Sequence, residues 1–221
     1  WAILNSAGNE QNNWQGMSPN WATSVATQQR SQGPFFQGLR ERFPWCERNT
    51  QNPAVLDLIL NGVTASYHAS LPSSLSMTPC IRSKEETLMA WETIQEYLEV
   101  GAIKEVSMQE EKHLIPWFVI KKGEKLRLIT NCKEINQYLE PKPFTLENWP
   151  EIFPFLRKGM WAAKIDLKHA YFHVGIADTL KPYICIQVRE KVFQFQAECF
   201  GLSTLPQQWQ SLMKVFLKKV E

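Results

Sequence analysis

The sequence predicts an α+β fold, in which an antiparallel sheet of few strands packs on helices. Three stretches lead to this prediction. Residues 83–100 carry apolar side chains at helical spacing, residues 117–129 contain two strands around a glycine turn, and residues 191–209 contain an alternating strand, a turn and a helix that begins near Ser203. We also expect an extended N-terminal arm before these elements.

The composition is typical of a globular protein that buries a sizeable core, with 44% hydrophobic and 21% charged residues in a chain of 221. No apolar run has the length of a bilayer span, and Trp1 is not preceded by a signal peptide. We therefore expect an intracellular protein of the cytoplasm or nucleus, without a membrane partner. The net charge of +2 is too small to indicate nucleic-acid binding by itself. The odd number of scattered cysteines predicts reduced thiols in the core: Cys46, Cys80, Cys132, Cys185 and Cys199.

Residues 1–52 are polar and show no hydrophobic period, which predicts an irregular arm. Isolated tryptophans interrupt this stretch, and Trp is favoured at docking contacts. They suggest anchors that dock on this domain or on a protein partner, and the alternative is a disordered linker with incidental aromatic residues. The tryptophans are Trp1, Trp14, Trp21 and Trp45.

Two helices follow the arm. Pro53 opens a short one that Asn61-Gly62 ends, and residues 63–71 then read as a strand. Residues 83–100 form the clearer helix, because Ser83 and Glu86 make a capping box and Gly101 ends it. Its predicted helical face consists of Leu88, Trp91, either Ile94 or Gln95, and Leu98.

A β-hairpin is predicted from residues 117–120 and 125–129, with a basic turn between them. One interpretation of the turn is a solvated hairpin tip. The other is a grip on phosphate groups, for which Lys and Arg side chains are suited. The basic residues are Lys121, Lys122, Lys125 and Arg127.

Residues 162–176 begin as a buried strand in which Asp166 interrupts an apolar run. A carboxylate among apolar residues needs a partner, and a metal ion is a strong one. Lys164 and Lys168 share its face of the strand. The alternative is an edge-strand Asp that caps the turn at Lys168-His169, and spacing alone does not separate the two interpretations. A short helix is expected before this strand at Glu151–Arg157.

Two motifs resemble the reverse transcriptase family of retrotransposons, closest to the DIRS group and its relatives. Lys-Ile-Asp-Leu-Lys-x-Ala-Tyr-Phe-His, at residues 164–173, resembles the palm strand with the first catalytic aspartate. Phe-Gly-Leu-Ser-Thr-x-Pro, at residues 200–206, resembles the turn and helix under the template and incoming nucleotide. The resemblance begins near residue 43. It implies a fingers-like region at residues 53–160 and a partial palm at residues 161–221.

The resemblance also implies roles for individual residues. Asp166 matches the first catalytic carboxylate, which would hold Mg²⁺ or Mn²⁺ together with the backbone carbonyl of Leu167. Arg127 matches the Arg that packs against the incoming nucleotide, and Tyr171 matches the residue that stacks under its sugar. The remaining expected nucleotide or template contacts are Lys122, Lys125, Phe200 and Gly201.

The chain departs from the family pattern at several positions. His169 stands where the family has Asp or Ser, and Glu198-Cys199 replaces Leu-Pro before the Phe-Gly turn. Asn131 and Lys133 stand where the family has Asp and Arg, whereas Asn136 keeps the family's Asn. Two-metal nucleotidyl transfer needs about three convergent carboxylates, but the chain has no Asp-Asp pair. Its aspartates are Asp57, Asp166 and Asp178, the last expected in a surface turn.

Two hypotheses of function follow. The first is a domesticated, non-catalytic derivative of a retroelement reverse transcriptase, acting as a scaffold for RNA, an RNA–DNA hybrid or a protein that docks on the N-terminal arm. It needs no metal. The second is the N-terminal half of an active enzyme that uses Mg²⁺ or Mn²⁺ and has its remaining palm beyond Glu221 or on another chain. The absent Asp-Asp pair favours the first hypothesis.

Overall fold

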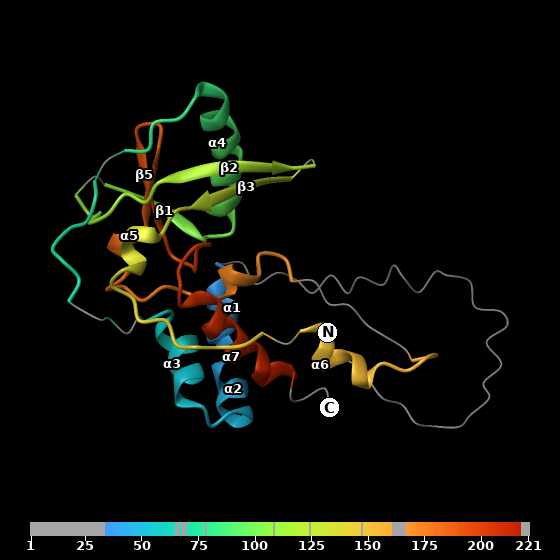
Figure 1. Ribbon diagram of the computed structural model, residues 1–221. Coiled ribbons are helices and arrows are strands. Elements are labelled where there is room, and N and C mark those ends of the chain that lie inside the picture. Colours follow the sequence, from blue (N-terminus) through green and yellow to red (C-terminus); the bar gives the residue numbers. More distant parts are fainter. Residues whose placement is uncertain are drawn as a thin grey trace.

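A helix of sixteen residues, α4, packs against two antiparallel sheets, and a group of shorter helices lies below them (Figure 1). The structure is a computed structural model. It describes residues 34–64, 67, 70–77, 79–107, 109–123, 125–146, 148–160 and 167–217.

Helix α4 spans Lys84–Glu99 and begins as the sequence predicts. The Ser83 hydroxyl accepts a hydrogen bond from the Glu86 amide, and the Glu86 carboxylate accepts one from the Ser83 amide. These two bonds satisfy amides that the helix itself leaves without partners. The predicted apolar face is rotated, because Leu88 is 55% exposed. The residues that α4 buries are Ala90, Thr93, Ile94 and Tyr97.

The larger sheet has the strand order β1-β5-β4, with β1 at Ile103–Val106, β4 at Cys185–Val188 and β5 at Lys191–Phe195. The smaller one is the predicted hairpin of β2 (Trp117–Lys122) and β3 (Lys125–Thr130). The three ladders, β1 with β5, β4 with β5 and β2 with β3, are antiparallel. The α+β class and the antiparallel sheets are therefore confirmed.

The buried Trp117 joins the two sheets. Its indole Nε1 donates to the Gln187 carbonyl at 2.7 Å, and the Ile115 amide donates to the Cys185 carbonyl at 2.7 Å. Trp91 and Tyr97 of α4 lie edge-on against Phe193 and Phe195 of β5. The core is thus continuous from α4 through both sheets.

The lower group consists of α1 (Phe35–Glu41), α2 (Phe43–Asn49), α3 (Pro53–Asn61) and α7 (Leu205–Leu217). Helices α3 and α7 match the predictions. The prediction of an irregular arm is wrong for residues 35–49, which form α1 and α2. These helices have seven residues each, too few for a period to emerge, and tertiary contacts hold them. Trp45 of α2, for example, stacks on Phe216 of α7 with ring centroids 5.5 Å apart. Residues 1–33, with the other three predicted anchors, lie outside the described residues.

The predicted strand at residues 63–71 needs correction. In residues 63–71, the described residues make only isolated bridges, Val63 to Ile176 and Tyr67 to Leu139. The strand predicted at the beginning of residues 162–176 falls mainly on residues outside the described part of the chain and stays a prediction. Further along, the 3₁₀ helix η3 spans Ala170–His173. The predicted helix at residues 151–157 is shorter, with α6 at Trp149–Ile152 and the 3₁₀ helix η2 at Phe153–Phe155. The other short elements are α5 (Lys133–Asn136) and η4 (Lys181–Tyr183).

In the described part of the chain, no helix combines the length and the apolar character that a bilayer crossing requires.

Candidate nucleic-acid interface

The turn Phe200-Gly201 is fixed against β3 and α5. The Thr130 hydroxyl donates to the Phe200 carbonyl. The Asn136 side chain donates to the Gly201 carbonyl at 2.8 Å and accepts from the Ser203 amide at 2.9 Å. Gly201 has φ +111°, and a Cβ there would lie 2.6 Å from the Thr130 carbonyl oxygen. Only glycine therefore fits at position 201. Hydrogen bonds to the carbonyls of both Phe200 and Gly201 hold the turn in place.

Aromatic rings gather beside the turn. Tyr171 of η3 meets Phe200 edge to face at 5.1 Å between centroids, and Trp209 of α7 at 5.8 Å. Phe200 keeps 46% of its surface exposed, so one side of the cluster faces solvent. Burial, and to a lesser extent Glu198, raises the pKa of the Tyr171 hydroxyl. The structure thus brings together three of the predicted contact residues: Tyr171, Phe200 and Gly201.

The basic hairpin lies apart from this cluster. Arg127 is exposed and pairs with Ile120, so the two share one face of the hairpin. Thr130, which holds the Phe200 turn, pairs with Trp117 on the opposite face. Lys122 and Lys125 face each other across the hairpin end, and their side chains lie outside the description.

The predicted metal ligand Asp166 lies outside the described residues, and its neighbour Leu167 is exposed. Among the residues that are described, no group of three His, Cys, Asp or Glu side chains converges in a way that would hold a metal. Asp57 accepts a hydrogen bond from Asn61, and Asp178 pairs with Lys181 at 2.6 Å in a surface turn, as predicted. The described residues alone do not fit Mg²⁺ or Mn²⁺.

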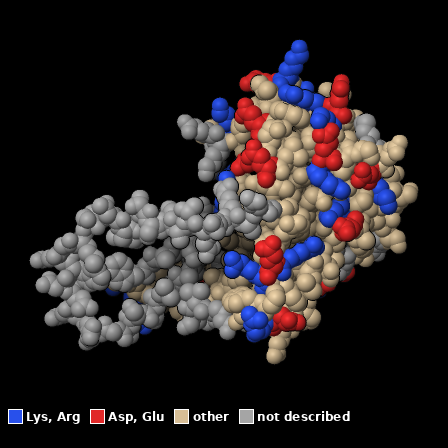
Figure 2. All heavy atoms as spheres, turned by 180° about the vertical axis from the view of Figure 1, so that it is seen from behind, with Lys and Arg blue, Asp and Glu red and all other residues tan. Residues whose placement is uncertain are grey.

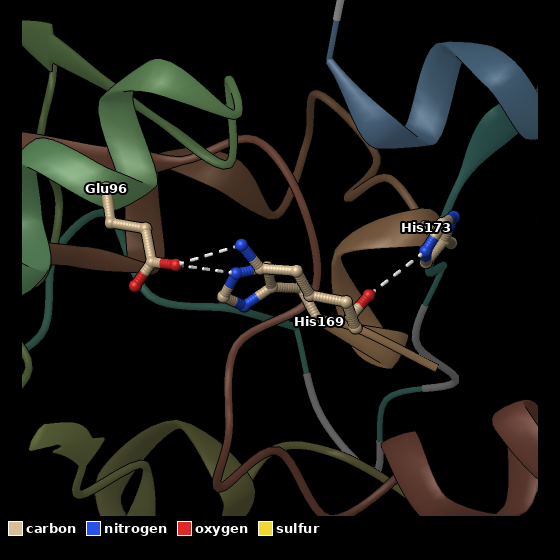
Figure 3. A network of polar contacts seen from close by, with 4 residues as sticks. Glu96, His169 and His173 are labelled. Carbon is tan, nitrogen blue, oxygen red and sulfur yellow. Dashed lines mark hydrogen bonds and ion pairs between the residues drawn. The ribbon is translucent and has the colours of Figure 1, made fainter. Parts of the chain in front are cut away.

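His169 has a partner on α4. Its Nε2 lies 2.9 Å from a Glu96 carboxylate oxygen, which the Lys168 ammonium approaches at 3.5 Å (Figure 3). His169 adopts the left-handed conformation, with φ +50°. The His173 Nε2 lies 3.4 Å from the Lys168 carbonyl, and burial lowers the pKa of this imidazole. His169 therefore ties η3 to α4, while Phe35 of α1 stacks on His173 at 5.1 Å.

Sequence reasoning missed three features of this region. Thr130 and Trp209 contact the turn and Tyr171 from distant parts of the chain, and no local pattern marks them. Glu198, which departs from the family pattern just before the turn, is fully buried. Cys132 and Cys199, which read as separate core cysteines, lie with their sulfur atoms 4.0 Å apart.

No family model matches the sequence. A stretch of 105 residues is 31% identical to the genome polyprotein of Petunia vein clearing virus, isolates Shepherd and Hohn. A stretch of 100 residues is 25% identical to the transposon Tf2-3 polyprotein of Schizosaccharomyces pombe. The chain is distantly related to retroelement polyproteins. Each match covers 45% of this chain, but only 5% of the viral and 8% of the transposon polyprotein.

Proposed function

We propose that this chain is a domesticated derivative or a fragment of a retroelement reverse transcriptase, with fingers and a partial palm. In this proposal the 221-residue chain binds single-stranded RNA and does not polymerise DNA. The observation that carries it is the cluster of Tyr171, Phe200 and Gly201, which the polymerase resemblance selected and which lies on one face. The distant relationship to retroelement polyproteins agrees with this ancestry.

The cluster has the properties of a surface for stacking bases. Phe200 presents a partly exposed ring that packs edge to face on Tyr171, and Thr130 holds its backbone carbonyl, so the backbone that carries the ring is fixed before a ligand arrives. Every base has an aromatic face, and stacking on such a ring is tolerant of sequence. The neighbouring cleft has a volume of about 420 Å³, and the exposed Lys133 on its wall provides a cation for phosphate.

We propose that the chain does not catalyse nucleotidyl transfer because too few carboxylates are available to hold two metal ions. Asp57 and Asp178 have other partners on α3 and in a surface turn, which leaves Asp166 as the remaining aspartate. Glu198 is adjacent to the turn but enclosed in the core, where burial raises its pKa well above the ordinary value and favours the neutral form. Each missing charge leaves the metals and the transition state without compensation.

An RNA titration tests the binding proposal. A labelled single-stranded RNA is titrated at low salt with the wild-type chain, with Phe200→Ala and with Phe155→Ala. Phe155 of η2 is the matched control, because it is an aromatic residue 67% exposed on another element. We expect Phe200→Ala to weaken binding about 5- to 150-fold, the range for one stacked base, and Phe155→Ala to leave it unchanged.

Two results would contradict the proposal. The first is an absence of RNA binding by the folded wild-type chain at low salt. The second is equal affinity of Phe200→Ala and wild type, which would place any RNA site elsewhere. Thermal unfolding of both variants shows whether the fold is kept. If the chain captures a protein through residues 1–52 and binds no RNA, the docking hypothesis replaces this one.

A further inference from the structure

Two cysteines from distant parts of the chain meet behind the Phe200 turn. Cys132 immediately precedes α5, and Cys199 follows β5, sixty-seven positions later. Their sulfur atoms lie 4.0 Å apart, within hydrogen-bond distance for thiols, and both residues are buried. All five cysteines are free thiols, and this is the one pair in sulfur contact among the described residues.

The two thiols have unequal surroundings. The Cys132 sulfur lies 3.9 Å from the Thr130 hydroxyl and 3.8 Å from the Phe200 carbonyl. The hydrogen bond from Cys199 lowers the pKa of Cys132, whereas the same bond and burial raise the pKa of Cys199 well above its ordinary value. One member of the pair is therefore suited to be the thiolate nucleophile and the other to remain a thiol.

A cleft leads to Cys132. Its lining includes Thr130, Cys132, Lys133 and Gly201 around a volume of about 420 Å³. A Cβ at residue 201 would lie 3.2 Å from the Cys132 sulfur, so the glycine leaves space beside the thiol. This opening is wide, and hydrogen peroxide is small enough to approach the thiol from it.

We propose that Cys132 and Cys199 form a redox-active dithiol that a hydroperoxide converts to a disulfide. The Cys132 thiolate attacks one peroxide oxygen and breaks the O–O bond. This step gives a sulfenic acid at Cys132 and, with one proton, a molecule of water from hydrogen peroxide. The Cys199 sulfur then attacks the Cys132 sulfur, forms the S–S bond and breaks the S–O bond, and the Cys199 proton passes to the departing hydroxide, which leaves as a second water. The two thiols lose two electrons, which the peroxide accepts.

The disulfide would connect α5 covalently to the Phe200 turn. The sulfur atoms must approach from 4.0 Å to about 2.05 Å. Thr130 and Asn136 already hold the two segments together, so the shift is shared by the thiol rotamers and a small movement of the turn. A link across sixty-seven positions restricts the unfolded chain strongly, and the oxidised protein should unfold at a higher temperature.

Mass spectrometry of the wild-type 221-residue chain tests the proposal without any nucleic acid. The reduced protein is treated with a stoichiometric amount of hydrogen peroxide, alkylated under denaturing conditions and digested. We expect loss of two thiols per chain, a linked peptide that joins Cys132 to Cys199, and recovery of both thiols with dithiothreitol. The oxidised chain should melt several degrees higher than the reduced one.

Variants separate the two roles. In Cys199→Ser the reaction should stop at a sulfenic acid on Cys132, which dimedone traps. Cys80→Ser is the control and should form the same linked peptide as wild type, because Cys80 is only half-buried and bonds to the Trp117 carbonyl instead. Cys132 and Cys199 remaining reduced while Cys80 is oxidised, or disulfides forming only between chains, would overturn the proposal.

Discussion

Glu198 lies in the core with its side chain fully enclosed, and its two carboxylate oxygens have no hydrogen-bond partner among the described residues. Burial of this kind disfavours the charged form and raises the pKa of the carboxyl well above its ordinary value. The sequence did not predict the burial, because Glu198 lies in an irregular segment after β5, where no hydrophobic period marks the buried positions.

Glu198 should make stability depend on pH. The folded chain holds the proton, while the unfolded chain releases it near the ordinary pKa of a glutamate. The contribution of protonated Glu198 to the free energy of unfolding is therefore fully present below the ordinary pKa of a glutamate. It is lost as pH rises towards the raised pKa of Glu198 in the folded chain. Glu198→Gln should match wild type in acid and become more stable as pH rises, by at most about 1.4 kcal/mol per pH unit.

Urea unfolding at several pH values measures this difference. Glu190→Gln is the control, because Glu190 is exposed at the turn between β4 and β5. Equal pH profiles for wild type and Glu198→Gln would mean that the buried carboxyl has a compensating partner.

At the scale of the elements, the sequence predicts the helices and strands that local patterns encode, but not those that depend on tertiary contacts. Helix α4 was predicted because its capping box is encoded within four residues, from Ser83 to Glu86. The hairpin was predicted because Gly123 interrupts two alternating stretches. Helices α1 and α2 were missed, since their stability comes from contacts such as Trp45 on Phe216 that a sequence does not display. The strand predicted at residues 63–71 was wrong for the same reason, because these residues make only isolated bridges among those described.

The end of α3 gives a test at this scale. Gly62 has φ +79°, and a Cβ there would lie 2.5 Å from the Gly175 carbonyl oxygen. Gly123 has φ +64°, but nothing lies within 4 Å of its added Cβ. We expect Gly123→Ala to cost about 1–2 kcal/mol for the left-handed backbone alone. Gly62→Ala should cost a further 1–3 kcal/mol, because α3 must move away from Gly175.

The free energies of unfolding of the two variants in urea decide the matter. Equal losses would show that α3 yields freely at its C-terminal end. In that case the contact between Gly62 and Gly175 would not determine the position of α3 relative to residues 175–176.

At the scale of the whole molecule, the α+β class and the antiparallel pairing followed from the sequence, whereas the division into two sheets did not. Of the candidate site, Tyr171, Phe200 and Gly201 come together. Arg127 lies on the other face of the hairpin, where strand parity places it. Lys and Arg are interspersed with Asp and Glu over the face that Figure 2 shows. This distribution and the net charge of +2 agree with weak electrostatic binding.

Salt dependence tests the part of the basic hairpin. Replacing Lys121, Lys122 and Lys125 with Gln should flatten the slope of log K against log salt by up to about three units, at roughly one unit per lost phosphate contact. A matched triple variant of the exposed Lys84, Lys142 and Lys158 should leave the slope unchanged. If the two variants behave alike, the hairpin is a solvated tip and phosphate contacts lie elsewhere.

The central claim is that this chain binds nucleic acid without polymerising it. The most direct measurement is incorporation of labelled deoxynucleotide on a primed homopolymer RNA, with Mg²⁺ or Mn²⁺, while binding of the same homopolymer RNA in single-stranded form is followed by fluorescence anisotropy. We predict binding without extension, and no difference in incorporation between wild type and Asp166→Asn. Template-dependent extension that Asp166→Asn abolishes would contradict the account and establish the chain as an active polymerase.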